Sequence, residues 1–453
     1  MRPAATRSTV DGMPAEENEA RPAVTLVGDQ WSPECSVLRT FLTRSEVPFT
    51  WLRPADPRGA QVLADNDLAA ADTPVLIDDA GRVLRASRPR GLEPVAEWLG
   101  LHTDPGGEVY DLVVVGAGPA GMAAAVYGAS EGLRTVVVER WAIGGQSGLT
   151  SRIENYLGFP DGISGADLAD RARRQATKFG AELVLTRHAN TLRDRTGGGF
   201  TVGFTDGGSV AGRALIIATG ANTRTLHAPG VADYAGRGVY YFAALTEAPL
   251  CTGHDVYIVG GANSAGQAAI YFSECARKVV LLVRGDSLDR EMSTYLIKQI
   301  DAIPTIEVRT HTEVAGAAGD THLERLTLRD TRTGTTETAD ATWLFAFIGA
   351  DPDTAWLGPR FLRDADGCLV TGNDIAAAGA AGAAGAATAT GAAGAAGAAE
   401  PGWPLARAPY HLETTVPGVF AAGDVRAWSA RRVAGAVGEG SMAVMLVHAY
   451  LAG

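Results

Sequence analysis

Residues 110–140 have the sequence YDLVVVGAGPAGMAAAVYGASEGLRTVVVER, and this stretch decides the fold. An apolar segment, a glycine-rich turn, an alanine-rich segment and a second apolar segment follow one another in it. This order predicts a strand, a helix and a parallel second strand, the unit on which dinucleotides bind. Gly116, Gly118 and Gly121 form the pattern G-x-G-x-x-G directly after the first strand.

Each glycine of this pattern has a physical role. Gly116 allows the tight turn, Gly118 lets the backbone approach a pyrophosphate, and Gly121 lets helix and strand pack closely. The phosphates then lie on the helix N-terminus. Glu139 ends the second strand, where its carboxylate is expected to accept hydrogen bonds from a ribose diol.

A second unit of the same kind occupies residues 254–284, HDVYIVGGANSAGQAAIYFSECARKVVLLVR. Gly260, Ala262 and Ala265 stand at the three motif positions. Where an acid would favour NADH, this chain has Val283 followed by Arg284. An arginine there accommodates a 2′-phosphate, so the sequence favours NADPH, and the alternative is that Arg284 is a solvated surface charge.

Composition limits the kinds of partner. The chain has 453 residues, a net charge of −12 and no basic run, which argues against nucleic acid and against an anionic membrane surface. Its four cysteines have neither metal-site nor disulfide spacing, so we expect a reducing cytoplasm and no metal. We also expect no signal peptide, and no uninterrupted apolar run long enough to span a bilayer.

The order of predicted elements gives an α/β fold with several domains. Residues 1–22 are expected to form a disordered tail. Residues 23–101 are expected to form a small domain with the order β-α-β-α-β-β-α. Residues 376–399 contain only Ala, Gly and Thr and are interpreted as a flexible low-complexity insertion.

Six further segments carry a resemblance to a known family. They are GGQ (144–146), IENYLGFP (153–160), IIATGA (216–221), FIGADPDT (347–354), VPGVFAAGDV (416–425) and RRVAGAVGEG (431–440). With the two glycine loops, they make residues 108–453 resemble the low-molecular-weight thioredoxin reductases among the FAD-dependent pyridine nucleotide-disulfide oxidoreductases.

The resemblance implies two Rossmann-like domains, with the NADPH domain (235–346) inserted between two segments of the FAD domain (108–229 and 350–453). It implies hydride transfer from NADPH to FAD, a homodimer, and hinges near 229–236 and 346–351. The residues that it assigns to FAD are Gly116, Gly118, Pro119, Ala120, Gly121, Glu139, Arg140, Gly144, Gly145, Gln146, Asn155, Ala218, Thr219, Gly220, Gly423, Asp424, Arg432, Val433 and Ala434. Those assigned to NADPH are Gly260, Gly261, Ala262, Asn263, Ser264, Ala265, Arg284, Ile348 and Gly349.

The chain departs from this family at one place. The redox Cys-x-x-Cys of the family would fall within Phe242–Thr246, where the residues are FAALT. A dithiol needs two sulfurs in local reach, so this route is closed here. The electron acceptor stays open among a disulfide partner, a one-electron carrier such as ferredoxin or flavodoxin, and oxygen or a quinone. A non-catalytic flavin-binding sensor or scaffold is the alternative of another class.

The small N-terminal domain resembles thioredoxin or glutaredoxin in its element order, in WSPEC (31–35) and in TPVL (73–76), where Pro74 is expected to be cis. Cys35 matches the second cysteine of such a domain, and Ser32 stands where the nucleophile should be. Cys35 is therefore the one candidate redox residue, and the alternative is an inert docking domain.

Overall fold

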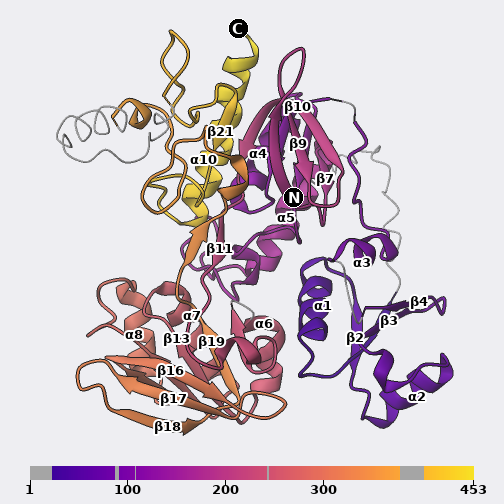
Figure 1. The fold of residues 1–453 in the computed structure, drawn as a ribbon, viewed down its shortest axis with the longest axis vertical. Helices are drawn as coiled ribbons and strands as arrows, with labels where there is room; N and C mark the ends of the chain where they lie inside the picture. Colours follow the sequence, from indigo (N-terminus) through magenta and orange to yellow (C-terminus); the bar gives the residue numbers. More distant parts are fainter. Residues whose placement is uncertain (1–22, 87–90, 108, 242–243, 378–401) are drawn as a thin grey trace, which may run out of the picture.

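The structure is a computed structural model that describes residues 23–86, 91–107, 109–241, 244–377 and 402–453. The expected tail 1–22 and residues 378–399 of the low-complexity tract lie outside the described residues. Phe242 and Ala243, the first two positions of the window where a cysteine pair was expected, also lie outside them. Figure 1 shows three parts, which we call the N-terminal unit, the first α/β domain and the second α/β domain.

The N-terminal unit has the element order expected from the sequence. Its elements are β1 (Val24–Val27), α1 (Pro33–Arg44), β2 (Phe49–Leu52), α2 (Pro57–Asp65), η1 (Ala70–Asp72), β3 (Val75–Asp78), β4 (Val83–Arg85) and α3 (Glu93–Trp98). The sheet has the order β2-β1-β3-β4, with β1 parallel to β2 and antiparallel to β3. Leu38, Phe41 and Leu42 bury one face of α1 against this sheet. The Thr73–Pro74 peptide bond is cis, as expected.

The first α/β domain is built on a seven-stranded sheet with the order β7-β6-β5-β10-β9-β8, and β21 also pairs with β10. Its elements are β5 (Tyr110–Val115), α4 (Pro119–Ser130), β6 (Thr135–Val138), η2 (Ser147–Leu149), α5 (Gly165–Lys178), β7 (Glu182–Val184), β8 (Ala189–Asp194), β9 (Phe200–Phe204), β10 (Ser209–Ile217), η5 (Ala355–Leu357), β21 (Val419–Ala421) and α10 (Val433–Leu451). β5, β6, β7, β10 and β21 are parallel, and such strands are covered on both faces, which explains the near-continuous valine runs of β5 and β6.

The second α/β domain lies between β10 and β21 in the sequence. Its elements are η3 (Val231–Tyr234), β12 (Val239–Tyr241), α6 (Ala244–Glu247), η4 (Ala248–Cys251), β13 (Asp255–Val259), α7 (Asn263–Ser273), β14 (Lys278–Leu282), α8 (Thr294–Ala302), β15 (Ile306–Arg309), β16 (Thr312–Ala318), β17 (Arg325–Asp330), β18 (Thr336–Asp340) and β19 (Trp343–Ala346). A parallel sheet of order β12-β19-β13-β14-β15 carries α7 and α8 on one face and the antiparallel β16-β17-β18 sheet on the other. Both domains therefore present strand ends and a helix N-terminus at one sheet edge, where ligands bind in such folds.

Two chain segments join the α/β domains, and they pair with each other. β11 (Ala221–Thr223) runs antiparallel to β20 (Ala350–Pro352) between the domains (Figure 1). The second connection lies close to the expected hinge at 346–351. The first expected hinge, 229–236, instead contains η3, whose fully buried Val231 packs in the core of the second domain. The ribbon of β11 and β20 is therefore the connection that would bend if the domains moved.

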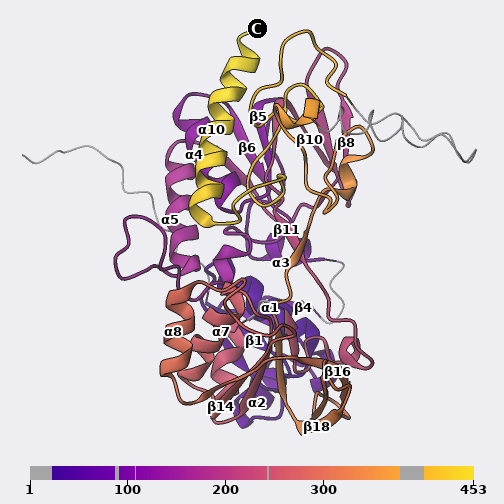
Figure 2. The ribbon, with the colours of Figure 1, turned by 90° about the vertical axis from the view of Figure 1, so that its left-hand side faces the viewer.

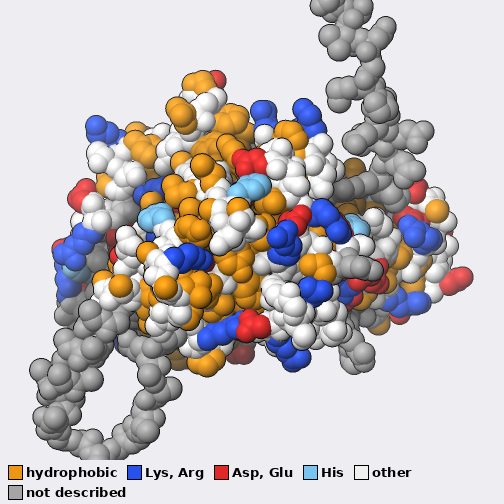
Figure 3. Space-filling model, turned by 90° about the horizontal axis from the view of Figure 1, so that it is seen from above, with side chains coloured by type: hydrophobic (Ala, Val, Ile, Leu, Met, Phe, Trp, Pro, Cys, Tyr) orange, Lys and Arg blue, Asp and Glu red, His pale blue; other side chains and the backbone are white. Residues whose placement is uncertain are grey.

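Helix α10 is the one helix of the described residues that is long and apolar enough to cross a bilayer by length and composition. Core helices of soluble proteins have the same length and composition, and Glu439 interrupts the apolar run. Helix α10 lies beside α4 and packs on it with one face (Figure 2). Met442 and Met445 of α10 are exposed. Figure 3 views the end of the molecule near the C-terminus and shows hydrophobic side chains gathered across its middle.

Candidate functional site

The first glycine loop forms the cradle that its spacing predicts. A Cβ on Gly121 would lie 1.8 Å from the carbonyl oxygen of Gly116, and a Cβ on Gly116 would lie 2.3 Å from that of Ala218. At Gly118 the nearest atom to such a Cβ would be 3.9 Å away, so this side of the turn is open. Gly118 is the N-cap of α4 and offers no side chain to the first helical N–H groups. These groups are free to bind an anion, so the loop fits a pyrophosphate.

Glu139 lies buried at the end of β6, beside this loop. Its carboxylate accepts hydrogen bonds from the N–H of Ala117 at 2.7 Å and from the N–H of Trp141 at 2.9 Å. Each carboxylate oxygen has a further lone pair, so a ribose hydroxyl can still donate to it. The acid therefore fixes the glycine loop from the position that the sequence predicted.

The segment 142–146 packs directly on the first glycine loop. The N–H of Gly144 donates to the carbonyl of Ala117 at 2.8 Å. A Cβ on Gly145 would lie 2.9 Å from the Cα of Gly118, and both Gly144 and Gly145 have positive φ. The structure thus brings the predicted Gly144 and Gly145 beside the predicted Gly118. We call residues 142–146 the flavin loop, after the role that the family resemblance gives to GGQ.

The C-terminal motif reaches the same cradle from β21 and α10. A Cβ on Gly423 would lie 3.0 Å from the Cβ of Ala120, and a Cβ on Gly440 would lie 2.0 Å from the carbonyl oxygen of Ala120. Asp424 follows Gly423 and is partly buried, and this burial raises the pKa of its carboxyl group. Helices α4 and α10 therefore cross closely, and the predicted Gly423 lies against both of them, next to Asp424 in the chain.

The other residues predicted for FAD are distributed around this centre. Thr219 follows β10 and donates to the carbonyl of Asp353, whose carboxylate accepts from Arg140 at 3.0 Å. Arg432 is the N-cap of α10, and Val433 and Ala434 form the first turn of that helix. Asn155 is exposed on the loop between η2 and α5. Among the described residues, no hydrogen bond joins Asn155 to the glycine loop.

The second glycine loop packs against the chain just after β19. A Cβ on Gly260 would lie 2.5 Å from the carbonyl oxygen of Phe347, next to the predicted Ile348 and Gly349. Helix α7 begins at Asn263, whose side-chain oxygen accepts from the N–H of Ser293 at 2.7 Å. Asn263 therefore fixes the start of α8. Arg284 is exposed just beyond β14, where it can meet a ligand phosphate.

The turn of the N-terminal unit that would hold a redox pair is docked on the second α/β domain. The ring of Trp31 stacks on His322 with centroids 4.3 Å apart and lies 5.1 Å from the ring of Trp343. Pro33 is in contact with the backbone of Gly236. This face of the unit is therefore covered by the same chain.

A buried ion pair continues this contact into α6. The Nη2 of Arg39 donates to Oε1 of Glu247 at 3.0 Å, and the hydroxyl of Ser36 donates to the same oxygen at 3.0 Å. The Arg39 side chain is 4% exposed and that of Glu247 is fully buried. Burial raises the pKa of Glu247, while the guanidinium of Arg39 opposes this shift. Helix α1 thus covers the last residue of α6, the helix where the redox cysteines of the family would fall.

Three of the four cysteines, Cys35, Cys251 and Cys368, are buried, and Cys275 is partly buried. Cys35 is fully buried between Gly28 and Pro74, and burial raises its pKa to about 12. Burial also raises the pKa values of Cys251, Cys275 and Cys368. The thiolate is the nucleophile in disulfide exchange, so a thiol held protonated is inert at neutral pH. These surroundings argue against the candidate redox role of Cys35.

Comparisons with known proteins give the same assignment as the two cradles. A family model of pyridine nucleotide-disulphide oxidoreductases matches residues 110–378. The chain belongs to this family. A thioredoxin reductase from Treponema pallidum is 30% identical over 76% of this chain and 97% of its own length. One from Streptomyces clavuligerus is 33% identical over 76% of this chain and 95% of its own length.

Solved structures agree with this. Thioredoxin reductase from Lactococcus lactis, described as its FR conformation, is 26% identical, covers 76% of this chain and 99% of its own, and has a TM-score of 0.63. The enzyme from T. acidophilum is 25% identical, covers 77% and 100%, and has a TM-score of 0.64. This pyridine nucleotide-disulphide oxidoreductase is thus an FAD-dependent NAD(P)H enzyme with the two-Rossmann fold, and its thioredoxin reductase homologues use FAD and NADPH.

Sequence reasoning missed several residues that hold the site together. Glu439 of α10 accepts from the N–H of Gly423 at 2.7 Å and from Arg426 at 2.6 Å, so it fixes the turn before Asp424. The only sequence signal for this role is the acidic residue between two glycines in GEG (438–440). Arg39, Arg44 and Glu247 were missed entirely, because nothing in the sequence indicates which partners they meet across the domains.

Proposed function

We propose that the protein takes hydride from NADPH onto FAD and passes the electrons from the flavin directly to an acceptor, without a cysteine pair. The observation that carries this proposal is the combination of two dinucleotide cradles with the buried thiols of Cys35 and Cys251, whose pKa values burial raises. Each cradle is made by a glycine turn that a Cβ would fill.

The residues of the chain have distinct roles in this proposal. FAD, when bound, supplies a two-electron acceptor that can release its electrons singly or together. The Gly116–Gly121 turn and the N-terminus of α4 hold its pyrophosphate, and Glu139 holds its adenosine ribose. The first turn of α10 offers free N–H groups, which favour negative charge on the reduced ring. Gly260 and Arg284 bind NADPH.

The docked N-terminal unit supports an acceptor that meets the flavin itself. A disulfide partner that approached α6 would have to displace Arg39 and Ser36 from the buried carboxylate of Glu247. Tyr240 and Tyr241, just before the window where the cysteine pair was expected, are held by other contacts. The ring of Tyr240 packs on Trp343 and Phe345, and the Tyr241 hydroxyl accepts a hydrogen bond from the N–H of Leu226. We therefore favour oxygen, a quinone or a one-electron carrier over a disulfide.

We further propose that residues 23–101 form a degenerate thioredoxin-like domain that no longer exchanges disulfides. The sheet order β2-β1-β3-β4, and the place of Pro74 beside Cys35, support this proposal. The scattered reduced cysteines support a cytoplasmic protein. The exposed Met442 and Met445 of α10 support a homodimer, and the mass of the protein in solution would decide this.

Replacement of Arg284 by methionine should weaken the binding of NADPH much more than the binding of NADH. The guanidinium can pair with the 2′-phosphate that only NADPH carries, so its loss should lower the affinity for NADPH by about 10- to 100-fold. The affinity for NADH should change by less than about 3-fold. The measurement is the dependence of anaerobic flavin bleaching on the concentration of each nucleotide.

Arg290→Met is the matched control, because Arg290 is an exposed arginine of the same region that already pairs with Asp286. It should leave both nucleotides unchanged. Equal weakening of NADPH and NADH in Arg284→Met would reject the role of Arg284. Bound FAD that neither nucleotide bleaches, even in the unsubstituted protein, would reject the enzyme and favour a flavin-binding sensor.

A further inference from the structure

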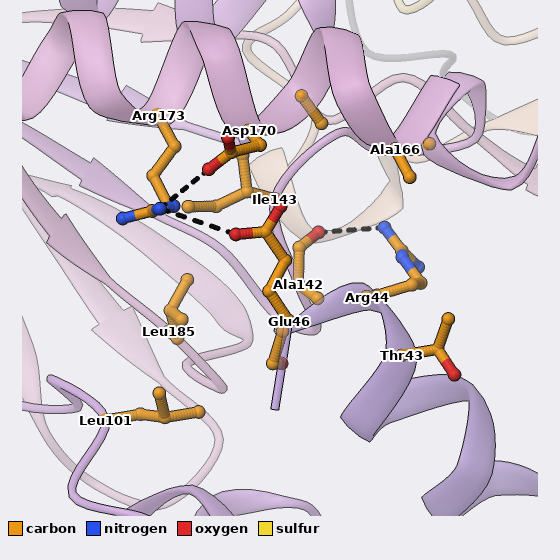
Figure 4. Close-up of a pocket in the computed structure, with 13 residues that line it drawn as sticks. Thr43, Arg44, Glu46, Leu101, Ala142, Ile143, Ala166, Asp170, Arg173 and Leu185 are labelled. Atoms are coloured by element: carbon orange, nitrogen blue, oxygen red, sulfur yellow. Dashed lines mark hydrogen bonds and ion pairs between the residues drawn. The ribbon is translucent and has the colours of Figure 1, made fainter. Parts of the chain in front are cut away.

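Helix α1 of the N-terminal unit ends beside the flavin loop. Arg44, its last residue, donates from Nη2 to the carbonyl of Ala142 at 2.8 Å and to that of Gly145 at 3.0 Å. Figure 4 shows the guanidinium reaching from α1 to the loop at Ala142. The residue therefore links the small unit to the backbone of the first α/β domain.

Both carbonyls belong to the flavin loop, which packs on the first glycine loop. Gly145 is in backbone contact with Gly118, and Gly144 is hydrogen-bonded to Ala117. The flavin loop is thus held on one side by the glycine loop and on the other by Arg44. Its two positive-φ glycines have no side chains with which to anchor it, and within the first domain hydrogen bonds of Gln146 and Ser147 hold it at one end. Arg44 adds a contact from the N-terminal unit to the carbonyls of Ala142 and Gly145.

The charge of Arg44 is unusually placed. The residue as a whole is half-buried, but its Nε has no contact with solvent and no hydrogen-bond partner among the described residues. Its two hydrogen bonds are to neutral carbonyls, and its guanidinium lies 5.9 Å from the ring centre of Trp141. Burial of a cation without a directly bonded anion is costly, and a nearby dianion would offset that cost.

We propose that Arg44 is a positioning residue for FAD, contributed by the N-terminal unit, which holds the flavin loop against the glycine loop and places a positive charge behind the pyrophosphate cradle. The inference rests on the proposed function only in that FAD occupies this cradle. It gives the N-terminal unit a role in cofactor retention that needs no redox chemistry in that unit.

The interface between α1, the flavin loop and α5 also offers a residue for a control substitution. A cavity of about 40 Å³ lies between α1, the flavin loop and α5, which is room for a few waters and no cofactor. On its other side Arg173 of α5 pairs with Asp170 at 2.7 Å and with Glu46 at 3.4 Å (Figure 4). Glu46→Gln removes a charge from the same interface and leaves both hydrogen bonds of Arg44 to the flavin loop in place.

The test is the dissociation constant of FAD in the full-length protein, measured by the return of flavin fluorescence on release. Loss of hydrogen bonds from a charged donor corresponds to about a 10- to 100-fold change in a dissociation constant, so Arg44→Met should raise the dissociation constant of FAD by this factor. Arg44→Lys, which keeps the charge and one donor group, should recover part of the loss. Glu46→Gln should stay within about 3-fold of the unsubstituted protein.

Two outcomes would overturn the inference. One is an Arg44→Met protein that retains FAD as tightly as the unsubstituted chain. The other is an equal loss in Glu46→Gln, which would make docking in general, rather than Arg44, the cause. If the unsubstituted protein binds no FAD at all, the proposed function fails as well, so the two failures are distinguishable.

Discussion

Replacement of Arg39 by leucine should destabilise the contact between the N-terminal unit and the second α/β domain by about 3–5 kcal/mol. The substitution leaves the fully buried carboxylate of Glu247 without its cation, and only Ser36 and Thr246 remain to bond it. A cation over the Trp51 ring is lost as well. Removal of one partner of a buried pair costs more than removal of both, because an uncompensated charge remains.

The loss should depend on pH in a defined direction. Burial raises the pKa of Glu247 and Arg39 opposes the shift, so in Arg39→Leu the pKa should rise further. For a carboxyl whose folded pKa lies above its unfolded value, the stabilisation is fully present below the unfolded pKa. It is lost as pH rises through the folded pKa. The variant should therefore lose stability relative to the unsubstituted protein from mildly acidic to alkaline pH.

The measurement is urea unfolding of the full chain across this pH range. Arg39→Leu combined with Glu247→Leu is the matched control, since it removes both charges and should recover most of the stability. An Arg39→Leu protein that unfolds at the same urea concentration as the unsubstituted one at every pH would show that the pair does not hold the unit in place.

Replacement of Gly121 by alanine should abolish stable FAD binding. The new Cβ would lie 1.8 Å from the carbonyl oxygen of Gly116 and 2.9 Å from its carbon, which are backbone atoms that cannot rotate away. Helix α4 must then move from β5, and the turn that receives the pyrophosphate opens. We expect an affinity for FAD at least about 100-fold lower, because displaced donors lose their charge-assisted hydrogen bonds.

Gly106→Ala makes the same chemical change where there is room, since its Cβ would lie 3.6 Å from the nearest atom, a Glu182 carboxylate oxygen. This variant should purify with its flavin. Absorbance of bound flavin in the two purified proteins gives the comparison. A Gly121→Ala protein that is as yellow as Gly106→Ala would remove the first glycine loop from the FAD site.

The parts of this molecule that the sequence predicted are those set by local pattern. The G-x-G-x-x-G turn, Glu139 and the alternation of strands and helices depend on residues close together in the chain, and the structure forms them as expected. The cis peptide before Pro74 and the order of elements in the N-terminal unit were also predictable.

The parts that were missed depend on contacts between distant segments. Arg39 and Glu247 meet across separate domains, and Arg44 reaches two carbonyls of the flavin loop. Glu439 of α10 accepts a hydrogen bond from the N–H of Gly423, in the turn after β21. This contact depends on the close crossing of α4 and α10 at Gly440. Asn263, which the glycine-loop pattern assigned to NADPH, also accepts a hydrogen bond from the N–H of Ser293 at the start of α8, and no spacing signals that contact. No spacing in a single sequence determines such partners.

An anaerobic titration with NADPH measures directly how many electrons the protein stores and whether the flavin alone holds them. A flavin alone accepts two electrons, whereas a flavin with a redox-active disulfide accepts four. We predict that about one equivalent of NADPH per bound FAD bleaches the flavin completely. A requirement for about two equivalents would show a second two-electron centre and would contradict direct transfer from the flavin.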